Sequence, residues 1–144
     1  MTVIAWDGKT LAADKQATNN GLKLVVTKIM KAEINGVKSL VAVAGGMAQA
    51  LNVVNWLING GEFPASQHSA DDWQPIVIIN RRGVFKYEQS PQPILYEGPY
   101  FSMGSGADVA MAAMHLGKTA EEAVELACAL CARCGMGIDT LTLS

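Results

Sequence analysis

The sequence predicts an α+β fold in which two β-sheets stack between two layers of helices, giving a four-layer α-β-β-α sandwich. Three observations favour it. Short apolar segments bounded by Asp-Gly or Asn-Gly turn signals recur along the chain. Segments with apolar residues at helical spacing fall into two groups, one in the middle and one later. Strands that are apolar on both faces need helices over the outer faces of their sheets.

Turn signals place the strands of the first half, which is expected to be mainly antiparallel sheet. Asp7 and Gly8 lie between two apolar segments and predict a β-hairpin. Asn35 and Gly36 mark a second turn further along the chain. The strand-forming segments are residues 3–6, 10–13, 22–34 and 38–45.

The helices and the second half follow from spacing and capping signals. Residues 47–58 carry apolar side chains at helical spacing and end in an Asn-Gly-Gly stop, after which a polar loop begins. Thr119, with Glu122 three residues later, has the spacing of a capping box for the last helix. The other expected elements are a hairpin of residues 75–80 and 83–89, a segment 99–106, helices 107–117 and 119–134, and a strand 138–143.

Composition bounds the class of protein. With 144 residues, 50% of them hydrophobic, the chain is expected to form one domain, residues 1–144, with a sizeable core. Its 11 Lys and Arg against 13 Asp and Glu leave no general basic field, so nucleic acid and anionic membranes are not expected as partners. No secretory signal opens the sequence, and the apolar stretch 40–58 carries polar residues that suit a buried strand and helix. We therefore expect a cytoplasmic protein whose three cysteines are thiols.

Thr2 raises the question of chemistry, because it directly follows the initiator methionine. Thr2 is small enough for Met1 to be removed, and removal would set a free α-amine beside the hydroxyl of the same residue. The α-amine has an ordinary pKa of roughly 7.7 to 8.0, which suits a general base at neutral pH. A terminal threonine and its own amine are a recognised nucleophile and base. The alternative is a frayed chain end without function.

Four motifs occur in order over nearly the whole chain. They are MTVIAWDGKTLAAD at the start, TKI at 27–29, VAVAGGMAQA at 41–50 and MGSGA at 103–107. Together they resemble the proteasome β-subunit and HslV peptidase family, and among its members the short phage and bacterial proteasome-like proteins that begin with Met-Thr. The resemblance implies the N-terminal nucleophile hydrolase form of the four-layer sandwich and a threonine-type peptidase activity.

The resemblance assigns the first three site residues. Thr2 matches the nucleophile of the family. Asp14, which ends the segment LAAD, matches the acid that orients the site and balances a buried lysine. Lys28 matches that lysine, whose positive charge favours the neutral, basic form of the amine. The alternative for Asp14 and Lys28 is an ordinary surface ion pair, although both lie in apolar segments, where unpaired burial is costly.

The glycine motifs imply the remaining site residues. Gly45 matches the residue whose backbone N–H receives the developing oxyanion, and Gly46 beside it leaves the approach free of side chains. The alternative for both is a helix start chosen for tight packing. Val43 and Met47 match positions that line the pocket for the residue before the cleaved bond, which implies a preference for apolar side chains. Ser105 is expected to cap the following helix. The resemblance implies that Ser105 also forms a hydrogen bond with the terminal amine.

The chain departs from the family near the end of the last predicted helix. The family has an acid there, a serine or threonine three residues later, and then glycines. In CARCGMGID, Cys131 takes the place of the acid, Cys134 that of the hydroxyl and Met136 that of a glycine. A thiol holds a charge less readily than a carboxylate, so the departure favours weaker polarisation of the amine and reduced activity.

The same stretch raises a rival idea. CALCARC has the C-x-x-C-x-x-C spacing of part of an iron–sulfur ligand run but lacks a fourth cysteine. Thiols at helical spacing, separated by Ala and Leu, favour buried packing. His68 and His115 have no partners at ligand spacing in the sequence. We therefore expect no metal and no other cofactor.

The first hairpin offers a geometric check on the proposed site. A strict two-residue turn at Asp7 and Gly8 would pair Thr2 with Ala13 and turn Asp14 to the opposite face. A three-residue or bulged connection, which pairs Thr2 near Asp14, is therefore expected.

These inferences lead to three hypotheses. The first is a peptidase in which Thr2 cleaves peptides or unfolded proteins inside a homo-oligomeric ring or stacked assembly, as the resemblance implies. An ATP-dependent unfoldase is a further partner, for which the sequence offers no docking motif. The second hypothesis is a catalytically silent proteasome-like scaffold, favoured by the departures at Cys131 and Cys134. The third, a thiol or cluster-binding redox module, rests on CALCARC alone.

Overall fold

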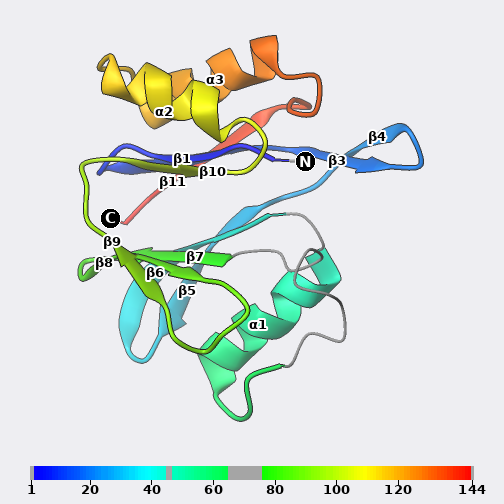
Figure 1. The fold of residues 1–144 in the computed structure, drawn as a ribbon. Helices are drawn as coiled ribbons and strands as arrows, with labels where there is room; N and C mark the ends of the chain where they lie inside the picture. The colour runs from blue at the N-terminus through cyan, green and yellow to red at the C-terminus, as the bar shows by residue number, and fades with distance from the viewer. Residues whose placement is uncertain (1, 45–46, 65–75, 144) are drawn as a thin grey trace.

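Four layers are stacked in the structure, a computed structural model that describes residues 2–44, 47–64 and 76–143. The outer layer on one side is a pair of helices, α2 (Ala107–His115) and α3 (Ala120–Leu130), and the outer layer on the other side is α1 (Met47–Asn59). Two sheets lie between them, one next to α2 and α3 and the other next to α1 (Figure 1). The predicted four-layer α-β-β-α sandwich is confirmed.

The first sheet carries the start of the chain. Its strands are β1 (Ile4–Trp6), β2 (Thr10–Asp14), β10 (Phe101–Met103) and β11 (Ile138–Thr142). They lie antiparallel in the order β10-β1-β2-β11. Ile4 consequently lies opposite Ala13 on one side and Met103 on the other. The first strand is thus an inner strand, fixed from both sides.

The second sheet is antiparallel in the order β5-β6-β7-β8-β9. Its strands are β5 (Ile29–Ile34), β6 (Val37–Val43), β7 (Ile76–Asn80), β8 (Gly83–Tyr87) and β9 (Ile94–Tyr96). Asn35 and Gly36 both adopt positive φ, 52° and 76°, which explains the Asn-Gly signal between β5 and β6. The sequence does not predict β9, because this edge strand is only three residues long and is exposed throughout.

A two-stranded hairpin of β3 (Gln16–Asn19) and β4 (Leu22–Val25) projects beyond the layers (Figure 1). The β pattern of residues 22–34 is divided between β4 and β5, since the chain leaves the hairpin before it enters β5. The break has a physical reason: the Val26 N–H donates to the Lys15 carbonyl at 2.8 Å and closes the base of the hairpin.

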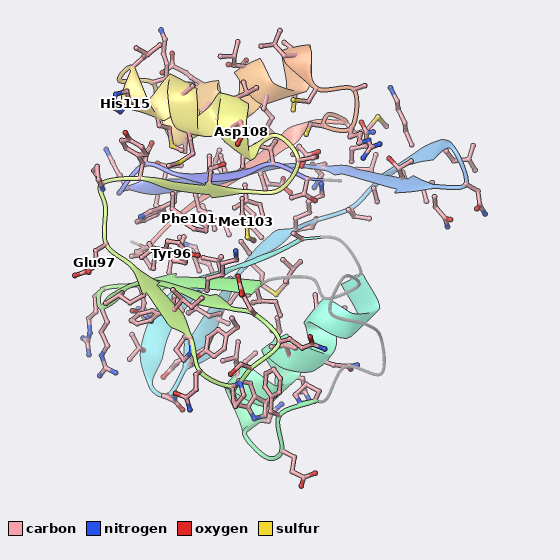
Figure 2. All side chains as sticks on the ribbon, in the orientation of Figure 1. Tyr96, Glu97, Phe101, Met103, Asp108 and His115 are labelled. Carbon is pink, nitrogen blue, oxygen red and sulfur yellow. The ribbon has the colours of Figure 1, made fainter. Side chains whose placement is uncertain are left out.

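Apolar side chains fill the spaces between the layers. Phe101 and Met103 lie on the inner side of β10, between the two sheets (Figure 2). Val3 and Ala5 face the opposite way, toward α2 and α3. The buried cluster between the sheets comprises Ile4, Trp6, Leu11, Ala13, Ile29, Leu40, Ala42, Ala44, Val77, Ile79, Val84, Phe101 and Met103. The space between the two sheets is therefore filled by packed core.

The last helix is shorter than predicted. It begins with the predicted capping box, in which Thr119 Oγ1 accepts the Glu122 N–H and the Glu122 carboxylate accepts the Thr119 N–H. It ends at Leu130, however, and not at Cys134. Cys131 already has extended backbone angles, φ −105° and ψ 119°. The chain turns here because the following loop is drawn back toward β2.

The connection between β1 and β2 is longer than a two-residue turn, as predicted, but its register is offset from the predicted one. Beyond the Ile4–Ala13 pair, the Asp14 N–H donates to the Val3 carbonyl at 3.2 Å. Val3, and not Thr2, is therefore the direct neighbour of Asp14.

Asp7 organises that connection and ties it to α3. Its Oδ1 accepts the N–H groups of Lys9 and Thr10 at 2.9 and 2.8 Å. Its Oδ2 accepts the N–H of Ala120, in the first turn of α3, at 2.8 Å. Partial burial opposes the charge, but these backbone hydrogen bonds prevail and hold the pKa of Asp7 below its ordinary value.

Across the described residues, no helix has both the length and the apolar character needed to cross a bilayer.

Asp7→Ala is expected to lower the free energy of unfolding by roughly 1–3 kcal/mol, because three backbone donors lose a charged acceptor. The loss should be full above the ordinary aspartate pKa of about 3.9 and should shrink as pH falls through the lowered pKa of the folded state. Urea denaturation over a pH series measures it. Glu125→Ala, on the exposed face of α3, is the control, and equal losses in the two variants would contradict the role of Asp7.

Candidate active site

Asp14 is the centre of the candidate site. It ends β2 and is 0% exposed. Its Oδ1 accepts hydrogen bonds from Lys28 Nζ at 2.7 Å and from the Val3 N–H at 3.1 Å. Its Oδ2 accepts the N–H groups of Gln16 at 3.4 Å and Gly135 at 3.1 Å. Four donors thus replace the water that a buried carboxylate has lost.

Lys28 links the two sheets. Its residue is 3% exposed, and its ammonium reaches Asp14 in the first sheet. Its carbonyl accepts the Val43 N–H at 2.9 Å, which anchors it beside β6 in the second sheet. The alternative of an ordinary surface ion pair is therefore wrong. A more exposed pair in the same region, Lys15 with Asp139, has side chains 21% and 33% exposed.

Thr2 is held at both ends of its backbone. It is 3% exposed, and its nitrogen donates to Ser105 Oγ at 3.2 Å. The Ser105 hydroxyl in turn lies 3.3 Å from the Thr2 carbonyl oxygen and donates to it. The predicted N-cap role of Ser105 was wrong, because the N-cap of α2 is Gly106, without a side-chain cap. The Ser105 hydroxyl instead contacts the start of the chain.

Two glycines next to Ser105 were not singled out by the sequence analysis, although both lie in the motif MGSGA. Gly106 donates its N–H to the Thr2 carbonyl at 3.1 Å. Gly104 has φ +99°, and a Cβ there would overlap the Thr2 carbonyl group. Only glycine allows this backbone to approach Thr2 so closely.

The loop after α3 supplies another residue that the sequence analysis missed. Gly135 gives its N–H to Asp14, and its carbonyl accepts the Lys15 N–H at 3.0 Å. Three successive residues here have positive φ: Gly135, Met136 and Gly137, at 154°, 64° and 108°. Met136 is strained in this conformation, since a Cβ disfavours it. The stretch CARCGMGID drew attention in the sequence, but only for its side chains, and a sequence does not reveal that the backbone N–H of Gly135 binds Asp14.

The remaining predicted site residues run along the sequence from the last residue of β6 to the first residue of α1. Val43 is fully buried and packs with Ala50 beneath α1. Gly45 and Gly46 lie outside the described residues, and Met47 is the first residue of α1. Their parts in oxyanion binding and substrate selection stay predictions.

The three cysteines lie close to the site. Cys134 is 5% exposed, and its Sγ is 3.9 Å from Ser105 Oγ. Burial raises the pKa of Cys134, although the Ser105 contact opposes the shift. Burial, reinforced by the Asp14 charge, raises the pKa of Cys128 to about 11. Cys131 is partly exposed. The raised pKa keeps Cys128 and Cys134 in the thiol form at neutral pH.

Within the described ranges, no group of three or more His, Cys, Asp and Glu side chains is arranged to hold a metal ion. His115 instead pairs its Nδ1 with the Tyr100 hydroxyl at 2.5 Å, on the exposed side of α2. His68 lies outside the described residues.

Comparison with protein-family models and with curated protein sequences gives no match. Solved structures do match. Eukaryotic HslV from Trypanosoma brucei superposes with a TM-score of 0.69 at 18% identity, with 97% of each chain covered. BPH from Thiobacillus denitrificans gives 0.69 at 19% identity, covering 99% of this chain and 98% of that one. The Gly-1 mutant of Anbu from Hyphomicrobium sp. strain MC1 gives 0.68 at 13% identity, covering 99% and 81%.

The chain therefore has an HslV-type, proteasome-like fold. The near-complete coverage extends over all four layers. At identities of 13 to 19% the likeness shows the fold alone. What the site does must be argued from its own residues.

Asp14→Asn is expected to lower the free energy of unfolding by roughly 3–5 kcal/mol, because the Lys28 ammonium stays buried without its carboxylate. Adding Lys28→Met to that variant should restore part of the stability, as chemical denaturation would show. Asp139→Asn, which breaks the more exposed ion pair, is the control and should cost less than about 1 kcal/mol. Strictly additive losses in the double variant would contradict a coupled buried pair.

Proposed function

We propose that the protein is a threonine peptidase whose nucleophile is the hydroxyl of Thr2, set free at the chain end by removal of Met1. One observation carries the proposal: a single oxygen of Asp14 binds both the Lys28 ammonium and the backbone N–H directly after Thr2. The positive charge is thereby held beside the start of the chain in a water-poor environment.

The proposed chemistry uses Thr2 as nucleophile and base. Its free amine takes the proton of its own hydroxyl, and the hydroxyl oxygen attacks a peptide carbonyl. The Lys28 charge disfavours the ammonium form of the amine and so keeps the amine neutral, the form that can accept a proton. Ser105, which contacts the Thr2 nitrogen at 3.2 Å, orients that amine. The amine then protonates the leaving nitrogen, and water frees the acyl group from the oxygen of Thr2.

Substrate binding is assigned to the start of α1. In this proposal the Gly45 N–H receives the developing oxyanion, and Gly46 leaves room for the substrate backbone. Val43 and Met47 set a preference for apolar side chains before the cleaved bond. Epoxomicin, found in complex with the Thiobacillus BPH, is a suitable probe of this site.

We further propose that the protein forms a homo-oligomeric ring or stacked assembly in the cytoplasm, with peptides or unfolded proteins as substrates. The likeness of the whole fold to HslV supports this. The same proposal includes an ATP-dependent unfoldase as a partner of this assembly. Sedimentation or native mass spectrometry gives the number of copies.

A catalytically silent proteasome-like scaffold is the second candidate. The contact between Cys134 and Ser105 favours it, because a thiol stands where a stronger hydrogen-bonding group would polarise Ser105. Such a protein would assemble without hydrolysing peptides.

Thr2→Ala is expected to abolish hydrolysis of fluorogenic peptides with apolar side chains before the cleaved bond, while leaving the assembly intact. Intact mass should first show that Met1 is absent from the wild-type protein. Epoxomicin should block the wild-type activity. Thr140→Ala, an exposed position on β11, is the matched control and should retain full activity.

Two results would decide against the peptidase. Retained Met1 leaves no free amine for the mechanism. Equal hydrolysis by the wild-type protein and Thr2→Ala would show that the measured activity does not come from Thr2, and it would favour the scaffold.

A further inference from the structure

Cys131 and Cys134 occupy the first and last positions of a turn directly after α3. The Cys134 N–H donates to the Cys131 carbonyl at 3.2 Å, across Ala132 and Arg133. A hydrogen-bonded turn of this kind keeps its first and last Cα atoms less than about 7 Å apart. A disulfide needs Cα atoms roughly 4.4–6.8 Å apart. The backbone therefore already holds the two thiols within range of a bond.

The two thiols differ in access. Cys131 is partly exposed, whereas Cys134 is buried against Ser105. In thiol–disulfide exchange, an accessible thiol meets the oxidant and a neighbouring thiol then resolves the mixed disulfide. Burial raises the pKa of both possible partners of Cys131, but the Ser105 hydrogen bond opposes the shift at Cys134, whereas the pKa of Cys128 reaches about 11 and leaves little thiolate.

We propose that Cys131 and Cys134 form a reversible disulfide next to the candidate active site, with a low-molecular-weight disulfide such as glutathione disulfide as oxidant. The Cys131 thiolate attacks one glutathione sulfur and releases the first glutathione thiolate. The Cys134 thiolate then attacks the Cys131 sulfur and releases the second. The protein loses two electrons and two protons, and one glutathione disulfide becomes two glutathione thiols.

The disulfide acts on the site through two contacts, a consequence that rests on the proposed function. A disulfide sulfur carries no hydrogen, so Cys134 can no longer donate to Ser105, which binds the Thr2 nitrogen. The Cys134 sulfur must also turn to within about 2.05 Å of its partner. Gly135, the next residue, gives its N–H to Asp14. Oxidation therefore disturbs both the orientation of Thr2 and the shell of Asp14.

Trypsin tests the disulfide without reference to activity, because Arg133 lies between the two cysteines. After incubation of the assembled protein with glutathione disulfide, cleavage should leave peptide 119–133 joined to the peptide that begins at Cys134. Reduction should separate them. Cys128→Ser should keep this link, and Cys131→Ser should lose it. A bond from Cys128 to Cys131 would stay inside peptide 119–133, and that result, or free thiols throughout, would overturn the proposal.

The effect on the site is measured on the same samples. Hydrogen exchange at the Gly135 amide should quicken on oxidation and recover on reduction; an unchanged rate would refute the coupling to Asp14. Peptide hydrolysis should fall roughly 2- to 10-fold, the value of one lost hydrogen bond, in wild type and Cys128→Ser but not in Cys131→Ser. If the reduced protein hydrolyses nothing, the peptidase proposal fails, whereas the peptide link and the exchange rate still decide on the disulfide.

Discussion

The buried ion pair of Asp14 and Lys28 is the constraint on which the rest of the structure depends. A single charge in this interior would cost several kcal/mol, so the two groups must meet, and they do so at 2.7 Å. One belongs to the first sheet and the other precedes the first strand of the second. Their contact therefore fixes how the sheets are placed at this edge, while the apolar cluster between the sheets keeps water from the rest of the seam.

The candidate site gathers short segments that lie far apart in the chain. The residue before β5 and the loop after α3 both bind Asp14 at the end of β2, and Asp14 and the turn before α2 in turn bind the first residues of the chain. Most of these contacts come from backbone groups, which cannot be exchanged by substitution. Glycine at 104 permits one of them and a strained Met136 accompanies another. The positions of the site residues are thus fixed mainly by the backbone conformation.

The sequence was informative wherever a local signal coincided with a tertiary contact. Thr119 with Glu122 formed the expected capping box. The pairing of Asp14 with Lys28 was implied by the family resemblance, and the apolar segments around both residues argued against an exposed pair. The contact of Ser105 with the Thr2 nitrogen followed from a family resemblance and not from local rules, which favoured an N-cap.

Other features depend on contacts that no local pattern encodes. The early end of α3 reflects a loop drawn toward Asp14, and the role of Gly135 is a backbone N–H that any residue possesses. The register of the first hairpin follows from the side chain of Asp7, which binds three backbone groups at once. In each case the deciding partner lies in another segment or in the turn itself.

The inner position of β1 has a consequence for timing. Once β10 has paired with it, the backbone of Thr2 is bonded to residues 105 and 106 and the residue is almost inaccessible. An aminopeptidase needs an extended, unpaired chain end. Removal of Met1 is therefore expected before β10 pairs with β1, so that maturation is governed by a race between excision and folding.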